Sequence, residues 1–245
     1  MKSVSIAAPP PPGGPSRPDR ATALTRRLLT LGAIAGPLFV VVFLAEGATR
    51  AGYDPLRHPV SSLELGDGGW VQTANFLVAG FLSLAYAAGL RRALKATPGP
   101  ARGSVWGPRL VGVWALALVA AGVFTTDPVS GYPSGTPDRL TEYGSVHAAL
   151  HDLLSLGGFV ALVAACLVFA RRFAARGERG WALYSALSAA VFTAAMVLAN
   201  IAFSQAEGLV AFGGLFQRIS VTAGWCWLTL LAVRTARHLR RPERA

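Results

Sequence analysis

Six long apolar stretches divide the chain, and basic residues alternate between the polar segments that separate them. The first, third, fifth and seventh polar segments hold 19 of the 23 Lys and Arg residues and only three of the 12 acidic residues. The other three segments and the adjoining helix ends hold four Arg and nine acidic residues. Because cytoplasmic loops of membrane proteins are enriched in Lys and Arg, this alternation predicts an integral membrane protein with both termini in the cytoplasm.

The composition indicates the same class of protein. Hydrophobic residues make up 53% of the 245 residues and charged residues 14%, whereas an average soluble domain has about 25% charged residues. The net charge of +11 is spread over short loops and helix ends rather than one folded surface. We therefore expect contact with the bilayer and with anionic lipid headgroups at the cytoplasmic face, and no nucleic acid partner.

The fold class that follows is an all-α, polytopic protein of the cytoplasmic membrane with six transmembrane helices. Each stretch is long enough to cross a hydrocarbon core roughly 30 Å thick. The predicted spans are residues 28–48, 70–90, 109–126, 146–170, 181–203 and 215–233. We expect a disordered, Pro- and Arg-rich cytoplasmic tail at 1–27, a transmembrane domain at 28–236 and a basic cytoplasmic tail at 237–245.

A short pattern recurs at the start of the second, fourth and sixth spans. Residues 69–72, 144–147 and 214–217 each consist of Gly, any residue, an apolar residue and then Gln or His. One interpretation is three repeated helical hairpins, related by an axis along the membrane normal. The other is that these residues only favour the start of a helix.

Polar residues gather on the non-cytoplasmic side of the predicted bundle. His147 and His151 lie four residues apart on one helix and share a face. Because charged groups in contact with lipid are costly, we expect Asp152 to face the bundle interior and Arg218 to pair with Asp152 or Glu207. The residues predicted to bind a ligand, in an outward-opening pocket between the second, fourth and sixth helices, are His147, His151, Asp152, Asp127, Arg218, Gln72, Asn75 and Gln217.

This pocket predicts a protein that is not an enzyme and that binds or passes a small or lipid-like ligand without a cofactor. The sequence contains no motif for binding ATP or a dinucleotide, so any transport would be passive or coupled to an ion. One alternative is a structural or assembly partner of another membrane protein, in which the same polar groups pair with each other.

A second alternative is a zinc-dependent lipid hydrolase. Imidazole nitrogens and carboxylate oxygens are ordinary zinc ligands, and a zinc-bound water becomes acidic enough to attack an ester or amide. The predicted metal ligands are His58, Asp127, His147 and His151. The further catalytic residues would be Ser61, Ser62 and Asp152.

Several motifs together resemble a known family of bacterial membrane proteins. In chain order they are Asp54-Pro55 with Ser61-Ser62, residues 69–76, Asp127-Pro128 with Gly131-Tyr132-Pro133, residues 147–152 and the region 208–219. The family is domain of unknown function 998, and the resemblance covers about residues 28–236. It implies six spans and no established activity.

A weaker likeness concerns the alkaline ceramidase superfamily, whose zinc site uses a Ser, an Asp and three His residues. The similar residues here are Ser61 or Ser62, Asp127, His147 and His151, together with His58. That superfamily has seven spans and carries its His pair on the last one, whereas the pair here opens the fourth span. The likeness implies zinc and hydrolysis of a membrane lipid.

Overall fold

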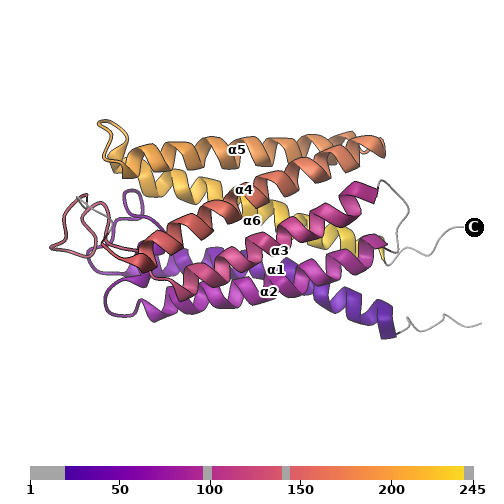
Figure 1. The fold of residues 1–245 in the computed structure, drawn as a ribbon, viewed down its shortest axis with the longest axis horizontal. Helices are drawn as coiled ribbons and strands as arrows, with labels where there is room; N and C mark the ends of the chain where they lie inside the picture. Colours follow the sequence, from indigo (N-terminus) through magenta and orange to yellow (C-terminus); the bar gives the residue numbers. More distant parts are fainter. Residues whose placement is uncertain (1–19, 96–100, 140–143, 240–245) are drawn as a thin grey trace, which may run out of the picture.

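The computed structural model describes residues 20–95, 101–139 and 144–239, which form an elongated helical bundle (Figure 1). Among these residues, six helices are long and apolar enough to cross a membrane, so the predicted fold class is confirmed. They are α1 (Arg20–Thr49), α2 (Trp70–Lys95), α3 (Ala101–Val123), α4 (Val146–Ala175), α5 (Arg179–Phe203) and α6 (Gly213–His238). Two short 3-10 helices, η1 (Ser61–Glu64) and η2 (Val210–Phe212), lie in the connections.

Most helices extend beyond the predicted spans at one end of the bundle. α1 begins at Arg20 rather than at residue 28, so residues 20–27 are helical and the predicted disordered tail is too long. α2, α4 and α6 likewise continue past their predicted ends, and α3 begins before its predicted start. Hydropathy marks only the part of a helix inside hydrocarbon, and long basic side chains let a helix continue through the headgroup region. Residues 1–19 and 240–245 lie outside the described residues.

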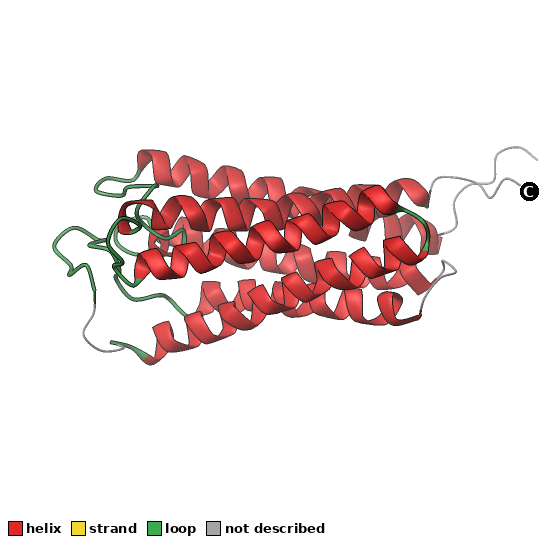
Figure 2. Ribbon diagram, turned by 90° about the horizontal axis from the view of Figure 1, so that it is seen from above, coloured by secondary structure: helices red, strands yellow, loops and turns green. Residues whose placement is uncertain are grey.

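The six helices form a ring in chain order. Each packs against its neighbours in the chain, and α6 packs against α1, which closes the ring. The start of α1 and the end of α6 lie at the same end of the bundle, together with the α4–α5 turn (Figures 1 and 2). We call this the basic end, because α1, α2, α4 and α6 all carry Arg residues there. The opposite end, which carries residues 50–69, 124–139, 144–145 and 204–209, is the loop end.

Small residues allow α1 to pack closely between its two neighbours. Gly32 lies against the ring of Tyr86 in α2, and Gly36 lies against Thr229 and Trp225 of α6. A Cβ atom at Gly32 would come within 2.3 Å of the Tyr86 ring, so a larger residue would push α1 away from α2. Small residues four positions apart are a common means of close approach between membrane helices.

An aromatic layer crosses the interior of the ring and takes one side chain from each helix. Its contacting rings have centroids 5.3 to 6.5 Å apart, a range in which tilted and edge-to-face contacts are favourable. The members are Phe39 of α1, Phe76 of α2, Trp114 of α3, Phe159 of α4, Phe192 of α5 and Trp225 of α6. The layer lies across the interior between the basic end and the loop end.

Candidate functional site

A cavity of about 1240 Å³ lies between the aromatic layer and the loop end. Five members of the layer, all except Trp225, line its floor. Residues of α3, α4, α5 and α6 form its walls, and residues 59–61, 126–129 and 139 of the loop-end connections line its other end. The cavity is therefore built from parts of the chain that are far apart in the sequence.

The cavity opens sideways between α4 and α5. These two helices are adjacent at the basic end, where a short turn joins them, and they diverge toward the loop end (Figures 1 and 2). Large apolar side chains on both helices line the cavity and are also exposed on the lipid-facing surface. They are Leu153, Leu156 and Val160 of α4 and Val197 and Ile201 of α5. We call this opening the lateral slot; it leads from the hydrocarbon region into the cavity.

Polar side chains line the cavity toward the loop end. Asp127, which follows α3, accepts hydrogen bonds from the backbone N–H and the hydroxyl of Ser145, at 3.0 and 2.9 Å. The Ser145 hydroxyl in turn accepts a hydrogen bond from the N–H of Ala148 and caps α4. Asp127 therefore fixes the start of α4, which is the wall of the lateral slot.

His151 and Asp152 follow on the same helix. His151 is 5% exposed, and its Nδ1 lies 2.7 Å from the carbonyl oxygen of Phe124. Since a carbonyl oxygen only accepts, Nδ1 carries the proton, and in this tautomer Nε2 has a lone pair. Asp152 lines the cavity but remains exposed, and its carboxylate makes no hydrogen bond or ion pair within the described residues.

Glu64 lies behind His151 and was not among the residues that we predicted to form the site. Its side chain is completely buried, its Oε2 is 3.8 Å from Nδ1 of His151, and neither of its oxygens has a hydrogen-bond partner in the described part of the chain. Burial raises the pKa of Glu64 to about 8, although the Thr126 backbone and the Thr73 hydroxyl act in the opposite direction. The carboxyl group is therefore neutral at neutral pH.

The model of a family described as "Protein of unknown function (DUF998)" matches residues 33–234. The chain belongs to the DUF998 family. The match extends from α1 to α6 and includes the cavity and the lateral slot. No curated protein and no solved structure is significantly similar to the chain. The predicted family is thus confirmed, and the chain is an integral, multi-pass membrane protein without an established activity.

Arg218 of this DUF998 protein does not line the cavity but holds the connection between α1 and α2. Arg218 is 8% exposed. Its guanidinium donates hydrogen bonds to the carbonyl oxygens of Pro55 and His58, at 2.6 and 3.0 Å. It also donates to the hydroxyl of Tyr53 at 2.6 Å. The predicted ion pair between Arg218 and an acidic side chain is wrong, because these oxygens surround the guanidinium instead.

The start of α6 holds the same connection through its backbone. The N–H groups of Gly214 and Leu215 donate to the carbonyl oxygens at positions 57 and 56, at 3.1 and 2.9 Å. The Oε1 atom of Gln217 accepts a hydrogen bond from the N–H of Val60 at 2.7 Å. These bonds use the free N–H groups that every helix start offers, and they position the connection over the bundle.

Both ring nitrogens of His58 are occupied by backbone groups. The Asp54 N–H donates to Nδ1 at 2.8 Å, and Nε2 lies 3.2 Å from the Ser130 carbonyl oxygen, to which it donates. Burial lowers the pKa of His58, so the ring is neutral in the protein. In the DUF998 protein, His58 therefore joins the two loop-end connections and has no lone pair left for a metal ion.

The structure does not bring the four predicted zinc ligands together. His147 is exposed and contacts the ring of Phe124, whereas His58, Asp127 and His151 have the partners described above. Across the described ranges, no group of three His, Cys, Asp or Glu side chains could hold a metal ion. The ceramidase-like arrangement is therefore not assembled. Of the predicted catalytic serines, Ser61 lines the cavity, and Ser62 is buried.

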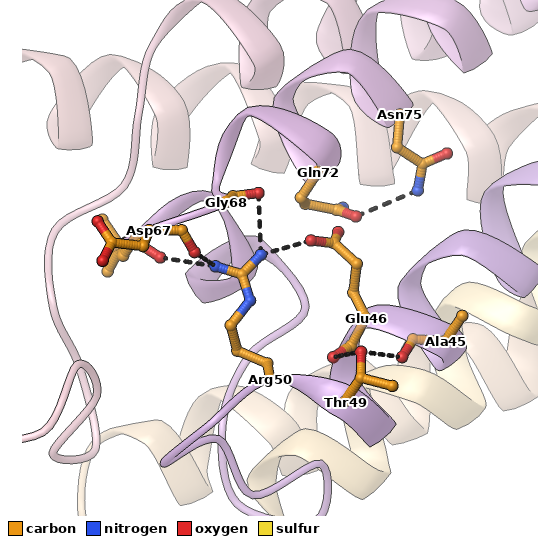
Figure 3. A network of polar contacts seen from close by, with 9 residues as sticks. Ala45, Glu46, Thr49, Arg50, Asp67, Gly68, Gln72 and Asn75 are labelled. Atoms are coloured by element: carbon orange, nitrogen blue, oxygen red, sulfur yellow. Dashed lines mark hydrogen bonds and ion pairs between the residues drawn. The ribbon is translucent and has the colours of Figure 1, made fainter.

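Gln72 and Asn75 belong to a separate network between α1 and α2 (Figure 3). Asn75 donates to the side chain of Gln72 at 3.1 Å and to the backbone of α1 at 3.2 Å. Arg50, at the end of α1, binds Glu46 and the carbonyl oxygens of the turn at 65–68. This network ties the end of α1 to the start of α2 and lies outside the cavity lining.

Half of the predicted ligand-binding residues thus line the cavity. The lining members are Asp127, His151, Asp152 and Gln217. The others are Gln72, Asn75 and Arg218, which are buried in structural networks, and His147, which is exposed. Gln72, His147 and Gln217 occupy equivalent places in the short repeated pattern, but their surroundings differ. Further polar lining residues, which are not among the predicted ligand-binding residues, include Arg139, Ser155, Thr193 and Asn200.

Proposed function

We propose that this DUF998 protein binds an amphipathic lipid. The acyl chain would pass through the lateral slot into the cavity, and the headgroup would lie among the polar side chains at the loop end. Under the positive-inside rule the basic end lies in the cytoplasm, in contact with anionic headgroups of the cytoplasmic membrane. The headgroup of the ligand then belongs to the outer leaflet, and binding of this kind needs no cofactor.

The cavity carries this proposal. Its volume of about 1240 Å³ exceeds the roughly 300–1,000 Å³ of most small-molecule pockets. Its floor and walls are mainly apolar, one side is open to hydrocarbon, and its polar groups lie at one end, as an amphipathic lipid requires. A purely structural bundle would fill this space with side chains, because protein interiors are close-packed.

Photo-cross-linking tests the proposal. The protein is placed in nanodiscs of phosphatidylcholine that carries a diazirine in its acyl chain, and the cross-linked residues are identified by mass spectrometry. We expect cross-links to Trp114 and Phe192, which are each 2% exposed and line the cavity. The surrounding bilayer alone cannot reach these two side chains. Cross-links confined to exposed residues such as Val113 and Val41 would contradict the proposal.

Narrowing the lateral slot should prevent this labelling. We expect Val197→Trp to lower cross-linking of Trp114 about tenfold, which corresponds to about 1.4 kcal/mol of binding free energy. Val197 is exposed and lines the cavity, so a Trp side chain there occupies the opening. Val191→Trp is the matched control, because Val191 is exposed on the same helix but does not line the cavity. Equal labelling of Trp114 in both variants would argue against access through this slot.

A further inference from the structure

We infer that the cavity selects lipids whose headgroup carries a primary ammonium group, as in phosphatidylethanolamine, and that the Asp152 carboxylate binds this group. This inference rests on the proposed function and adds the headgroup chemistry to it. Three properties of the polar lining support it: the unused hydrogen-bond acceptors, the balance of charge and the presence of one cation beside two carboxylates.

The first property concerns His151. Its side chain is 6% exposed and lines the cavity, and Nδ1–H donates to a backbone carbonyl oxygen. Nε2 has no partner within the described residues and, in the tautomer with the proton on Nδ1, it can accept a hydrogen bond. Because this side chain lines the cavity, a ligand there that donates a hydrogen bond can occupy the free lone pair of Nε2.

Asn200 and Asp152 offer further acceptors. The Nδ2 atom of Asn200 donates to the carbonyl oxygen of Met196 at 2.8 Å, which leaves its Oδ1 for other contacts. Both carboxylate oxygens of Asp152 are without partners in the described part of the chain. The lining also supplies donors: Nε2 of Gln217, whose Oε1 is used by Val60, the guanidinium of Arg139, and the buried Nε1 of Trp114, which has no partner in the described part of the chain. A headgroup with several N–H donors satisfies the acceptors.

The second property is charge. Within the described lining, Asp127 and Asp152 are the carboxylates, and Arg139 is the basic residue. The formal charges of these three side chains sum to −1. A cation is therefore attracted, and a lipid whose headgroup is only anionic would meet two carboxylates.

The third property is that the cation and the carboxylates line the same cavity. A zwitterionic headgroup has a phosphate and an amine, and Arg139 can meet the phosphate while Asp152 meets the amine. Phosphatidylcholine has the same charges, but its quaternary nitrogen has no N–H to donate. The acceptors of His151 and Asn200 therefore distinguish between the two zwitterionic lipids.

The test compares three lipids with identical acyl chains. Nanodiscs contain equal amounts of phosphatidylethanolamine, phosphatidylcholine and phosphatidylglycerol, and the acyl-chain diazirine is placed on one of the three at a time. Cross-linking is measured at Trp114 and Phe192, which line the cavity floor. We expect phosphatidylethanolamine to label these residues about fivefold more than phosphatidylcholine, and phosphatidylglycerol to label them least.

The variant Asp152→Asn should bring the ratio of phosphatidylethanolamine to phosphatidylcholine close to one. Asp67→Asn is the matched control, because Asp67 is exposed, lies at the same end of the bundle and does not line the cavity. Equal labelling by the three lipids, or most labelling by phosphatidylglycerol, would refute the inference but not the proposed function. Absence of floor labelling with every lipid would refute both.

Discussion

The variant Arg218→Met is expected to lose about 3 kcal/mol of stability or more, because each acceptor left unsatisfied costs roughly 1–3 kcal/mol. The methionine keeps much of the aliphatic volume but removes the Arg218 donor from the Tyr53 hydroxyl and from the carbonyl oxygens of Pro55 and His58, of which the His58 oxygen keeps a contact with the Tyr53 hydroxyl. These groups are buried, so water cannot easily replace the guanidinium. We therefore expect a lower midpoint of thermal unfolding in detergent and faster hydrogen exchange at residues 53–60.

Arg57→Met is the control for this prediction. Arg57 lies on the same connection and pairs with Asp138, but both side chains are partly exposed, at 28% and 63%. Exposed ion pairs contribute about 1 kcal/mol or less. If Arg218→Met cannot be purified, Tyr53→Phe removes only one partner of the guanidinium and should have an intermediate effect. Similar stability of the Arg218 and Arg57 variants would show that α6 does not hold this connection through Arg218.

We expect the free energy of unfolding of the natural protein to fall as pH rises from about 4.5 to about 8. The variant Glu64→Gln should not show this fall. In this window the unfolded chain has lost the Glu64 proton, but the folded protein retains it, because burial holds the pKa near 8. Folding therefore takes up a proton and becomes less favourable as pH rises. Above pH 8, the difference between the two pKa values lowers the free energy of unfolding by at most about 5 kcal/mol.

Thermal unfolding in detergent at a series of pH values from 5 to 9 measures this effect. The Gln side chain has the same shape and never ionises, so the variant should be more stable than the natural protein at pH 8 and similar to it at pH 5. Glu207→Gln, at an exposed position in another loop-end connection, should behave like the natural protein. A pH profile that is unchanged by Glu64→Gln would mean that the buried carboxyl group does not control stability.

The transmembrane architecture could be predicted from the sequence because the bilayer imposes it. Apolar length defines each span, and the alternation of basic residues identifies which helix ends share a side. The same argument placed the polar residues of α4 and α6 at the loop end. Hydropathy could not predict how far the helices extend at the basic end. It falls where a helix leaves the hydrocarbon region, although the helix itself continues.

The details of the site depend on features that leave no pattern in the sequence. The sequence predicts an acidic partner for Arg218, but its partners are mainly backbone carbonyl oxygens, which every residue has. Glu64 was not selected because the sequence does not show that η1 turns its side chain into the bundle. The cavity itself results from the divergence of α4 and α5, which depends on packing along whole helices.

Because the aromatic layer lies across the bundle, we expect the cavity to hold a ligand and not to form a channel through the membrane. Six side chains, one from each helix, form a connected set of ring contacts across the interior, and we expect this layer to block the passage of water and ions through the bundle. A lipid that enters must leave by the way it came. Cells that produce large amounts of this protein should therefore keep their membrane potential.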